Sequence, residues 1–149
     1  MDLFETVNEG IKNAMKARDR VRLEALKGIK KEFLEAKTAP GAGGELPDDR
    51  AMAILVKMAK QRKETAQIYK DNGRDDLAQG ELNELAVIEE FLPKALTEEE
   101  LEAELRAIIA EVGATSAKDM GKVMGVASKR LQGRADGRAI SAKVKQLLN

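Results

Sequence analysis

The sequence predicts an all-α protein, with an N-terminal helical domain that contains long helices and a small C-terminal three-helix domain. The first observation behind this fold class is composition: the 149 residues are rich in Leu, Ala, Glu, Lys and Arg, which is typical of helical proteins. The second is periodicity, because apolar side chains recur every three or four residues along almost the whole chain. The third is that no useful length alternates apolar and polar residues, the pattern of a half-buried strand.

Two helices are expected before the first long loop. The first covers about residues 2–17, where apolar positions recur at helical spacing. The second begins after Asp19, whose short acidic side chain suits a helix N-cap. Prolines and glycines over residues 38–47 then predict a loop.

Two further helices complete the predicted N-terminal domain. The third begins at Asp48 or Asp49 and ends at Asn72-Gly73, a pair typical of a left-handed helix terminus. The fourth starts at residues 74–76 and reaches Phe91. The apolar stripes of the four helices predict that these side chains, among others, are buried: Met15, Leu34, Ile68, Tyr69 and Leu77.

Pro93 marks a domain boundary because proline disfavours helix in the preceding residue, so the predicted domains are residues 1–92 and 93–149. In the second domain, Thr97 and Glu100 form a capping box, and Gly113 closes that helix. Ser116 with Asp119 is expected to cap the next helix in the same way. Gly133 ends that helix, and Asp136 caps the last one.

The residue types limit the chemistry that this chain can perform by itself. It contains neither Cys nor His, which excludes disulfides, Ser-His-Asp triads and the usual zinc sites. Paired carboxylates such as Asp75-Asp76 stand at predicted helix N-termini, where the helix dipole favours negative charge. The glycines form neither a Walker loop nor a dinucleotide fingerprint. The sequence therefore predicts no catalytic residue, no metal site and no cofactor.

The chain is expected to reside in the cytoplasm without a membrane partner. No apolar run approaches the roughly 18 residues that span a bilayer. The acidic start, MDLFETVNEG, lacks the basic and apolar regions of a signal peptide.

Formal net charge is zero, but it is unevenly distributed. Residues 10–63 carry fourteen Lys/Arg against seven Asp/Glu, residues 64–113 carry four against fourteen, and residues 114–149 carry eight against two. Two basic blocks thus flank an acidic one. One interpretation is charge complementarity between packed helices with ordinary solvated faces; the other is a pair of basic surfaces that bind a polyanion.

The tail carries the more specific candidate surface. On a helical wheel, Lys118, Lys122, Gly125 and Lys129 share one face, with Gly121 beside it, opposite an apolar stripe. Bare backbone between cations allows close approach of a sugar-phosphate chain, whereas the alternative is that the glycines let a neighbouring helix pack tightly. Beyond Gly133, a predicted helix start offers backbone amides to phosphate, together with two arginines, Arg134 and Arg138.

Any nucleic acid bound by this chain is expected to be recognised by its backbone and shape, because aromatic residues are only 3% of the sequence. A second basic surface is conceivable in the first three helices. Its cations are Lys12, Lys16, Arg18, Arg20, Arg22, Lys27, Lys30, Lys31, Lys57, Lys60, Arg62 and Lys63.

Two phrases of the tail, KDMGKVMG at residues 118–125 and GRADG at 133–137, resemble the C-terminal signature of the GatB/YqeY family. Nearly the whole chain resembles a stand-alone YqeY-like protein. Supporting phrases are MKARD at residues 15–19, KQR at 60–62, GRDDLA at 73–78 and FLP at 91–93.

This resemblance implies a function as well as a fold. The tail is similar to the terminal domain of the B subunit of a glutamine-dependent aminoacyl-tRNA amidotransferase, where that domain holds tRNA. It therefore implies tRNA as a partner and Lys118, Gly121, Lys122, Gly125, Lys129, Arg134 and Arg138 as contact residues. Two alternatives remain open: a component of a carbon–nitrogen ligase with glutamine as amido donor that acts with partner subunits, and a protein-binding adaptor without RNA contact.

Overall fold

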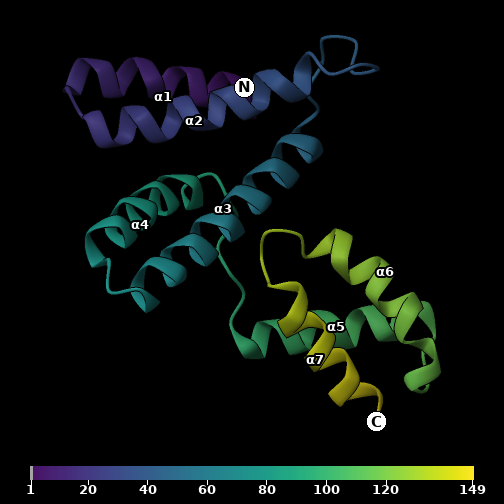
Figure 1. Cartoon of the computed structure of the whole chain (residues 1–149). Helices are drawn as coiled ribbons and strands as arrows, with labels where there is room; N and C mark the ends of the chain where they lie inside the picture. Colours follow the sequence, from purple (N-terminus) through teal and green to yellow (C-terminus); the bar gives the residue numbers. More distant parts are fainter. Residues whose placement is uncertain (1) are drawn as a thin grey trace. The chain divides into compact units, whose positions relative to one another are not determined.

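The structure, a computed structural model, describes residues 2–149, and these residues form helices with no strand (Figure 1). The predicted all-α class is therefore confirmed. The backbone divides into two compact units, Met1–Leu92 and Pro93–Asn149, which we call the N-terminal unit and the C-terminal unit. Among the described residues, no helix is both long enough and apolar enough to cross a membrane.

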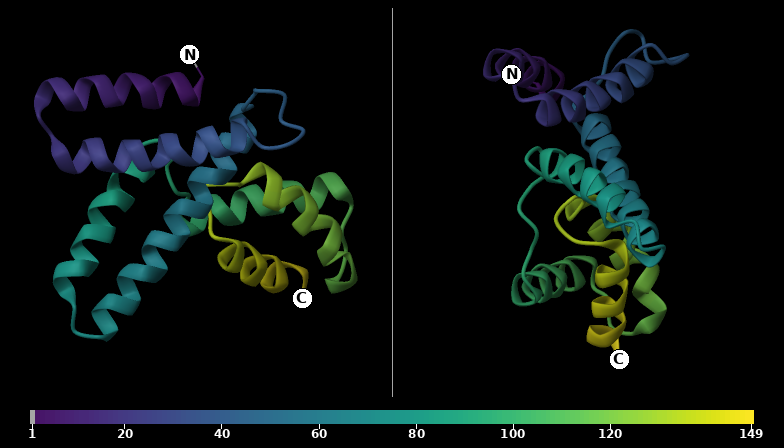
Figure 2. Two further views of the ribbon diagram at one scale, coloured as in Figure 1. Left: turned by 45° about the horizontal axis from the view of Figure 1, so that its top comes forward. Right: turned by 60° about the vertical axis from the view of Figure 1, so that its left-hand side comes forward.

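The N-terminal unit consists of two helical hairpins. Helices α1 (Leu3–Ala17) and α2 (Arg20–Lys37) run side by side, as do α3 (Asp48–Asp71) and α4 (Asp75–Glu89) (Figures 1 and 2). The hairpins meet chiefly where α2 packs on α4. The largest fully buried side chains of this core are Phe33, Leu26, Ile29, Leu55, Ile88 and Val7.

Local hydrogen bonds explain where these helices begin and end. The Asp2 carboxylate accepts the Glu5 amide at 2.8 Å, and Glu5 reaches back to complete a capping box on α1. As predicted, Asp19 caps α2, accepting the Arg22 amide at 3.0 Å. The expected left-handed terminus of α3 is present, since Gly73 has a φ of 72°.

The C-terminal unit is a three-helix cluster of α5 (Glu98–Val112), α6 (Met120–Arg130) and α7 (Gly137–Leu148), in which each helix contacts the other two. The Thr97–Glu100 capping box and the left-handed Gly113, with a φ of 68°, delimit α5 as predicted. The buried side chains are Leu101, Leu105, Ile108, Val123, Ala127, Leu131, Ile140, Val144 and Leu148.

The predicted capping box before α6 is wrong in its detail. Ser116 does accept a backbone amide, that of Lys118 at 3.4 Å, but the first turn, Ala117–Asp119, is a 3₁₀ helix. Asp119 turns back to accept the Thr115 amide at 2.9 Å. A 3₁₀ helix has three residues per turn rather than 3.6, and this tighter turn brings the Asp119 carboxylate back to the backbone of Thr115.

Several side chains predicted to be buried are exposed. The exposed fractions are 60% for Met15, 41% for Leu34, 58% for Ile68 and 40% for Leu77, and Tyr69 is half-buried. A helix in a hairpin contacts few neighbouring helices, so the buried stripe of side chains is narrower than the stripe of apolar residues in its sequence. The sequence pattern cannot show how wide the covered stripe is.

Candidate nucleic-acid interface

Helix α6 presents two contrasting faces. Val123, Ala127 and the following Leu131 are buried in the C-terminal core, which fixes the rotation of the helix. Met120 and Met124 are half-buried beside them. The opposite face is solvent-exposed and carries Gly121, Lys122, Gly125 and Lys129, and the exposed Lys118 lies in the 3₁₀ turn just before this helix.

The two α6 glycines serve no helix packing. A Cβ atom added at Gly121 or Gly125 would have no heavy atom within 4 Å among its non-local neighbours, whereas one added at Gly10 of α1 would lie 3.2 Å from Leu26 Cδ1. Gly10 therefore permits close packing of α1 on α2. Gly121 and Gly125 instead leave bare backbone facing solvent, which removes the packing interpretation considered for them above.

The lysines of this face are not neutralised by ion pairs. Within residues 2–149, no carboxylate oxygen lies within 4.0 Å of the ammonium of Lys118, Lys122 or Lys129. The neighbouring Arg130 differs, because its guanidinium is 2.8 Å from Glu111 of α5. This pair lowers the pKa of the Glu111 carboxyl and raises that of Arg130. Arg130 thus links two helices, while the three lysines remain available to an anion.

The turn between α6 and α7 is held in place by the start of the unit. The Leu96 amide donates to the Arg134 carbonyl at 2.8 Å, and the Arg134 side chain is half-buried. The pKa of the Glu100 carboxyl is lowered, first by its hydrogen bonds with Thr97 and additionally by the charges of Arg134 and Lys94. Part of the positive charge of Arg134 therefore acts within the unit.

The N-terminus of α7 already contains an anionic cap. Asp136 accepts the Arg138 amide at 3.3 Å, so a carboxylate takes one of the amides that a phosphate would use. The Arg138 side chain is exposed. The structure thus places Gly121, Lys122, Gly125 and Lys129 together on α6 and Lys118 in the 3₁₀ turn before it, whereas Arg134 and Arg138 belong to the next turn and helix.

The second basic cluster, in the N-terminal unit, is partly neutralised. Arg62 Nε lies 2.6 Å from Glu84 Oε2 and 3.6 Å from Glu81 Oε2, so α4 carboxylates hold this α3 cation. Arg22 forms an ion pair with Glu90. Lys12 and Lys27 each lie within 4.0 Å of a glutamate on their own helix. These contacts support intramolecular charge complementarity for a part of the predicted cluster.

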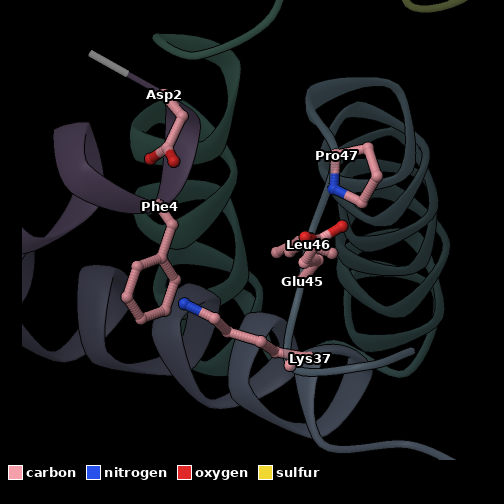
Figure 3. Close-up of a pocket in the computed structure, with 7 residues that line it drawn as sticks. Asp2, Phe4, Lys37, Glu45, Leu46 and Pro47 are labelled. Carbon is pink, nitrogen blue, oxygen red and sulfur yellow. The ribbon is translucent and has the colours of Figure 1, made fainter. Parts of the chain in front are cut away.

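A hollow of about 450 Å³ lies between the start of α1 and the loop before α3. In it, the Lys37 ammonium points over the Phe4 ring, 4.3 Å from the ring centroid, with Glu45, Leu46 and Pro47 along the other wall (Figure 3). The cation is already stabilised by the aromatic face. Within the described part of the chain, no group of three or more His, Cys, Asp or Glu residues is arranged to hold a metal ion.

A second hollow, of about 300 Å³, was not anticipated from the sequence. It is lined by residues at the α1–α2 turn: Ala14, Met15, Arg18, Asp19, Arg20 and Leu23. The sequence feature that corresponds to this hollow is the phrase MKARD at residues 15–19, in which the apolar Met15 precedes a turn without glycine.

Residues 4–148 match the family described as Yqey-like protein. Two curated relatives, from Kluyveromyces lactis and Lachancea thermotolerans, both carry the name Altered inheritance of mitochondria protein 41, mitochondrial. The identities are 25% over 115 residues and 24% over 114 residues, which cover 75% of this chain in both cases. The alignments cover 61% and 60% of those relatives, so the chain matches about three fifths of their length. Their names place those proteins in mitochondria, and a cytoplasmic location for this chain stays a prediction.

Proposed function

Because the chain belongs to the YqeY-like family, we propose that it is a tRNA-binding accessory protein whose contact surface lies on the C-terminal unit. The surface comprises the 3₁₀ turn before α6, the exposed α6 face, the turn that follows it and the start of α7. Its residues are Lys118, Gly121, Lys122, Gly125, Lys129, Arg134 and Arg138.

The observation that carries this proposal is the exposed glycine pair between cations. A glycine inside a helix costs roughly 1 kcal/mol relative to alanine, and neither Gly121 nor Gly125 gains a packing contact in return. A ligand that must approach the helix backbone closely explains why small residues stand there. The flanking lysines, without carboxylate partners in residues 2–149, indicate that this ligand is anionic.

Each exposed cation would contact a phosphate rather than a base. The four aromatic residues of the chain, Phe4, Phe33, Tyr69 and Phe91, all belong to the N-terminal unit. The C-terminal unit therefore offers no aromatic ring on which an unpaired base stacks. A surface of lysines and bare backbone is suited to the regular phosphate array of a structured RNA, which proteins recognise by shape.

The resemblance of the tail phrases to the amidotransferase B subunit supports tRNA as the specific ligand. In this proposal the chain supplies binding and lacks the chemistry of amide transfer. An ammonia-transfer assay with glutamine, ATP and misacylated tRNA tests this directly, because amidated product from the pure chain alone would establish the ligase alternative instead.

Salt dependence is the first test of the binding proposal. If about five cations contact phosphates, the slope of log affinity against log salt concentration should be roughly −3.5 to −4.5. Fluorescence polarisation with labelled tRNA over a salt series measures this slope. An affinity that does not change with salt would contradict a phosphate-binding surface.

Charge reversal locates the surface. The double variant Lys122→Glu with Arg134→Glu should weaken tRNA binding strongly. The control, Lys60→Glu with Lys63→Glu on α3, changes the net charge by the same amount and should weaken binding less. If the α3 variant loses binding and the α6 variant does not, the contact surface lies in the N-terminal unit. Loss in both to the same degree would indicate a response to net charge alone.

Variants at Gly125 test whether the bare backbone of α6 is required for RNA binding. Gly125→Leu introduces a good helix former into open space, so the fold should be retained while the RNA backbone is kept away. Gly80→Leu is the matched control, because Gly80 is also exposed and unpacked but lies on the acidic α4. Equal RNA affinity for wild type and Gly125→Leu would show that bare backbone is not required.

A further inference from the structure

The turn between α1 and α2 carries a second surface, separate from the proposed RNA contact, which we call the hairpin tip. It is the hollow of about 300 Å³ lined by Ala14, Met15, Arg18, Asp19, Arg20 and Leu23. Its floor is part of the fold, since Ala14 is buried and Leu23 packs against the N-terminal core.

The apolar part of the hairpin tip is open to solvent. Met15 is 60% exposed, and Val21, which follows Arg20 in the chain, is 55% exposed. Exposed apolar surface with a polar rim is typical of an interaction site. Methionine is flexible and polarisable, which suits it to contact a variable partner side chain.

The rim of the hairpin tip is cationic. Arg18 and Arg20 line the hollow, and Lys16 follows Met15 in the chain. All three cations are exposed, and within residues 2–149 no carboxylate oxygen lies within 4.0 Å of their charged groups. The one carboxylate in the hollow, Asp19, is engaged in capping α2 through the Arg22 amide. The hairpin tip therefore carries more positive than negative charge, and an acidic ligand would balance it.

Arg18 occupies a backbone position that favours glycine. Its φ is 57°, and it is the only non-glycine residue with a positive φ among residues 2–149. This left-handed conformation after a helix is strained for a side chain with a Cβ. A long cation is thus held at the turn where glycine would suit the fold better, and such strain is often associated with functional sites.

We propose that the hairpin tip docks an acidic protein segment, whose bulky aliphatic side chain enters the hollow while its carboxylates meet Lys16, Arg18 and Arg20. The concave apolar floor favours this occupant. A nucleic acid would use the cations and leave Met15 uncovered, and a bilayer surface would be matched by protruding side chains rather than a hollow. Arginine and methionine are enriched in protein interfaces.

The test is a titration of the full-length protein, followed by NMR of the methionine methyl groups and backbone amides. The probe is a synthetic Glu-rich helical peptide with Leu along one face. Two comparison peptides keep the length: one replaces Leu by Ser, the other replaces Glu by Lys. The Glu/Leu peptide should shift the NMR signals of the Met15 methyl group and of the Arg18 and Arg20 amides. The affinity of each comparison peptide should be lower by at least about tenfold.

Variants then test the site itself. Met15→Ser with Arg20→Ala should weaken binding of the Glu/Leu peptide by about tenfold, the size expected of an interface hot spot. The matched control, Ile68→Ser with Lys57→Ala, removes an equally exposed apolar side chain and a cation elsewhere in the N-terminal unit, and should leave binding unchanged. Arg18→Gly relieves the left-handed strain, so it should raise the Tm while it weakens peptide binding.

Several outcomes would overturn the proposal. Equal binding of the Glu/Ser peptide would show that the hollow contributes nothing, and shifts confined to other residues would place the peptide elsewhere. Tip shifts produced by duplex RNA or by anionic phosphatidylglycerol vesicles, but not by the Glu/Leu peptide, would assign the tip to those ligands. The proposed tRNA contact lies in the C-terminal unit, so the outcome of these peptide experiments does not depend on whether the chain binds tRNA.

Discussion

The same residue types have different roles in the two units. In the N-terminal unit, Arg62 is held by Glu81 and Glu84, and Gly10 permits α1 to approach Leu26. In the C-terminal unit, Lys122 has no carboxylate within 4.0 Å in residues 2–149, and Gly121 beside it has no packing neighbour. Arg62 and Gly10 thus contribute to packing within the N-terminal unit, whereas Lys122 and Gly121 of the C-terminal unit are left exposed. Stability and binding should therefore respond separately to matched substitutions in the two units.

The largest expected effect tests whether the two cores are independent. Phe33→Ala removes a fully buried ring of the N-terminal core and should lower the free energy of unfolding of this unit by about 3–5 kcal/mol. Tyr69, the only tyrosine in a chain without tryptophan, reports unfolding of the N-terminal unit by fluorescence, while far-UV circular dichroism reports both units. The urea midpoint seen by Tyr69 should fall, with part of the dichroism transition retained.

Leu105→Ala is the counterpart in the C-terminal core, where Leu105 is fully buried. It should cost about 2–5 kcal/mol and leave the Tyr69 transition in place. If each variant lowers both transitions together, the two units unfold as one cooperative body.

The paired and unpaired cations should differ in their contribution to stability. Arg62→Ala leaves Glu81 and Glu84, whose side chains are 21% and 40% exposed, without their counter-charge and should cost about 1–2 kcal/mol. Lys122→Ala should change stability by less than about 0.5 kcal/mol while it weakens tRNA binding. Urea unfolding and polarisation with tRNA measure the two quantities. A large loss of stability for Lys122→Ala would mean that the lysine has a structural role.

Substitution of the helical glycines should raise stability rather than lower it, and by a smaller amount. Gly121→Ala should stabilise the C-terminal unit by roughly 1 kcal/mol, because helix propensity improves and the new methyl group meets nothing. Gly10→Ala should gain less, because Leu26 must move to accept a Cβ that would lie 3.2 Å away. Thermal unfolding of the two variants gives the comparison. Equal gains would show that α1 adjusts to the methyl group without strain.

The smallest expected effect is a difference in acid sensitivity. In the C-terminal unit, hydrogen bonds lower the pKa of Glu100, Glu111 and Asp119. In the N-terminal unit, the hydrogen bond from Arg74 lowers the pKa of Asp76. A carboxyl whose pKa is lower in the folded state stabilises the fold above its unfolded pKa, which is ordinarily about 4.5 for Glu and 3.8 for Asp. That stabilisation is lost as pH falls through the lowered folded pKa.

The C-terminal unit should therefore lose more stability than the N-terminal unit as pH falls below about 4.5. Glu111→Gln, which removes the partner of Arg130, should reduce the pH dependence of the C-terminal transition. Urea midpoints at neutral and acid pH, for wild type and variant, measure it. An unchanged slope in Glu111→Gln would mean that the ion pair does not persist in solution.

Sequence patterns were most successful where structure is set by near neighbours. The capping box at Thr97, the cap at Asp19 and the left-handed Gly73 and Gly113 were predicted because each depends on groups within a few residues along the chain. Asp119 was the exception, because a 3₁₀ turn redirected its carboxylate to Thr115. Met15 and Ile68 were misplaced because their exposure depends on how many helices lie beside them.

Helix periodicity and capping are local properties, so the all-α class, most helix ends and the cations and glycines of the candidate surface could be predicted from the sequence alone. Which of these residues are engaged depends on how the helices pack. Contacts between helices distant in sequence hold Arg62 against α4 and Arg130 against Glu111. They also bury Val123 and thereby turn Gly121, Gly125 and the lysines of α6 toward solvent.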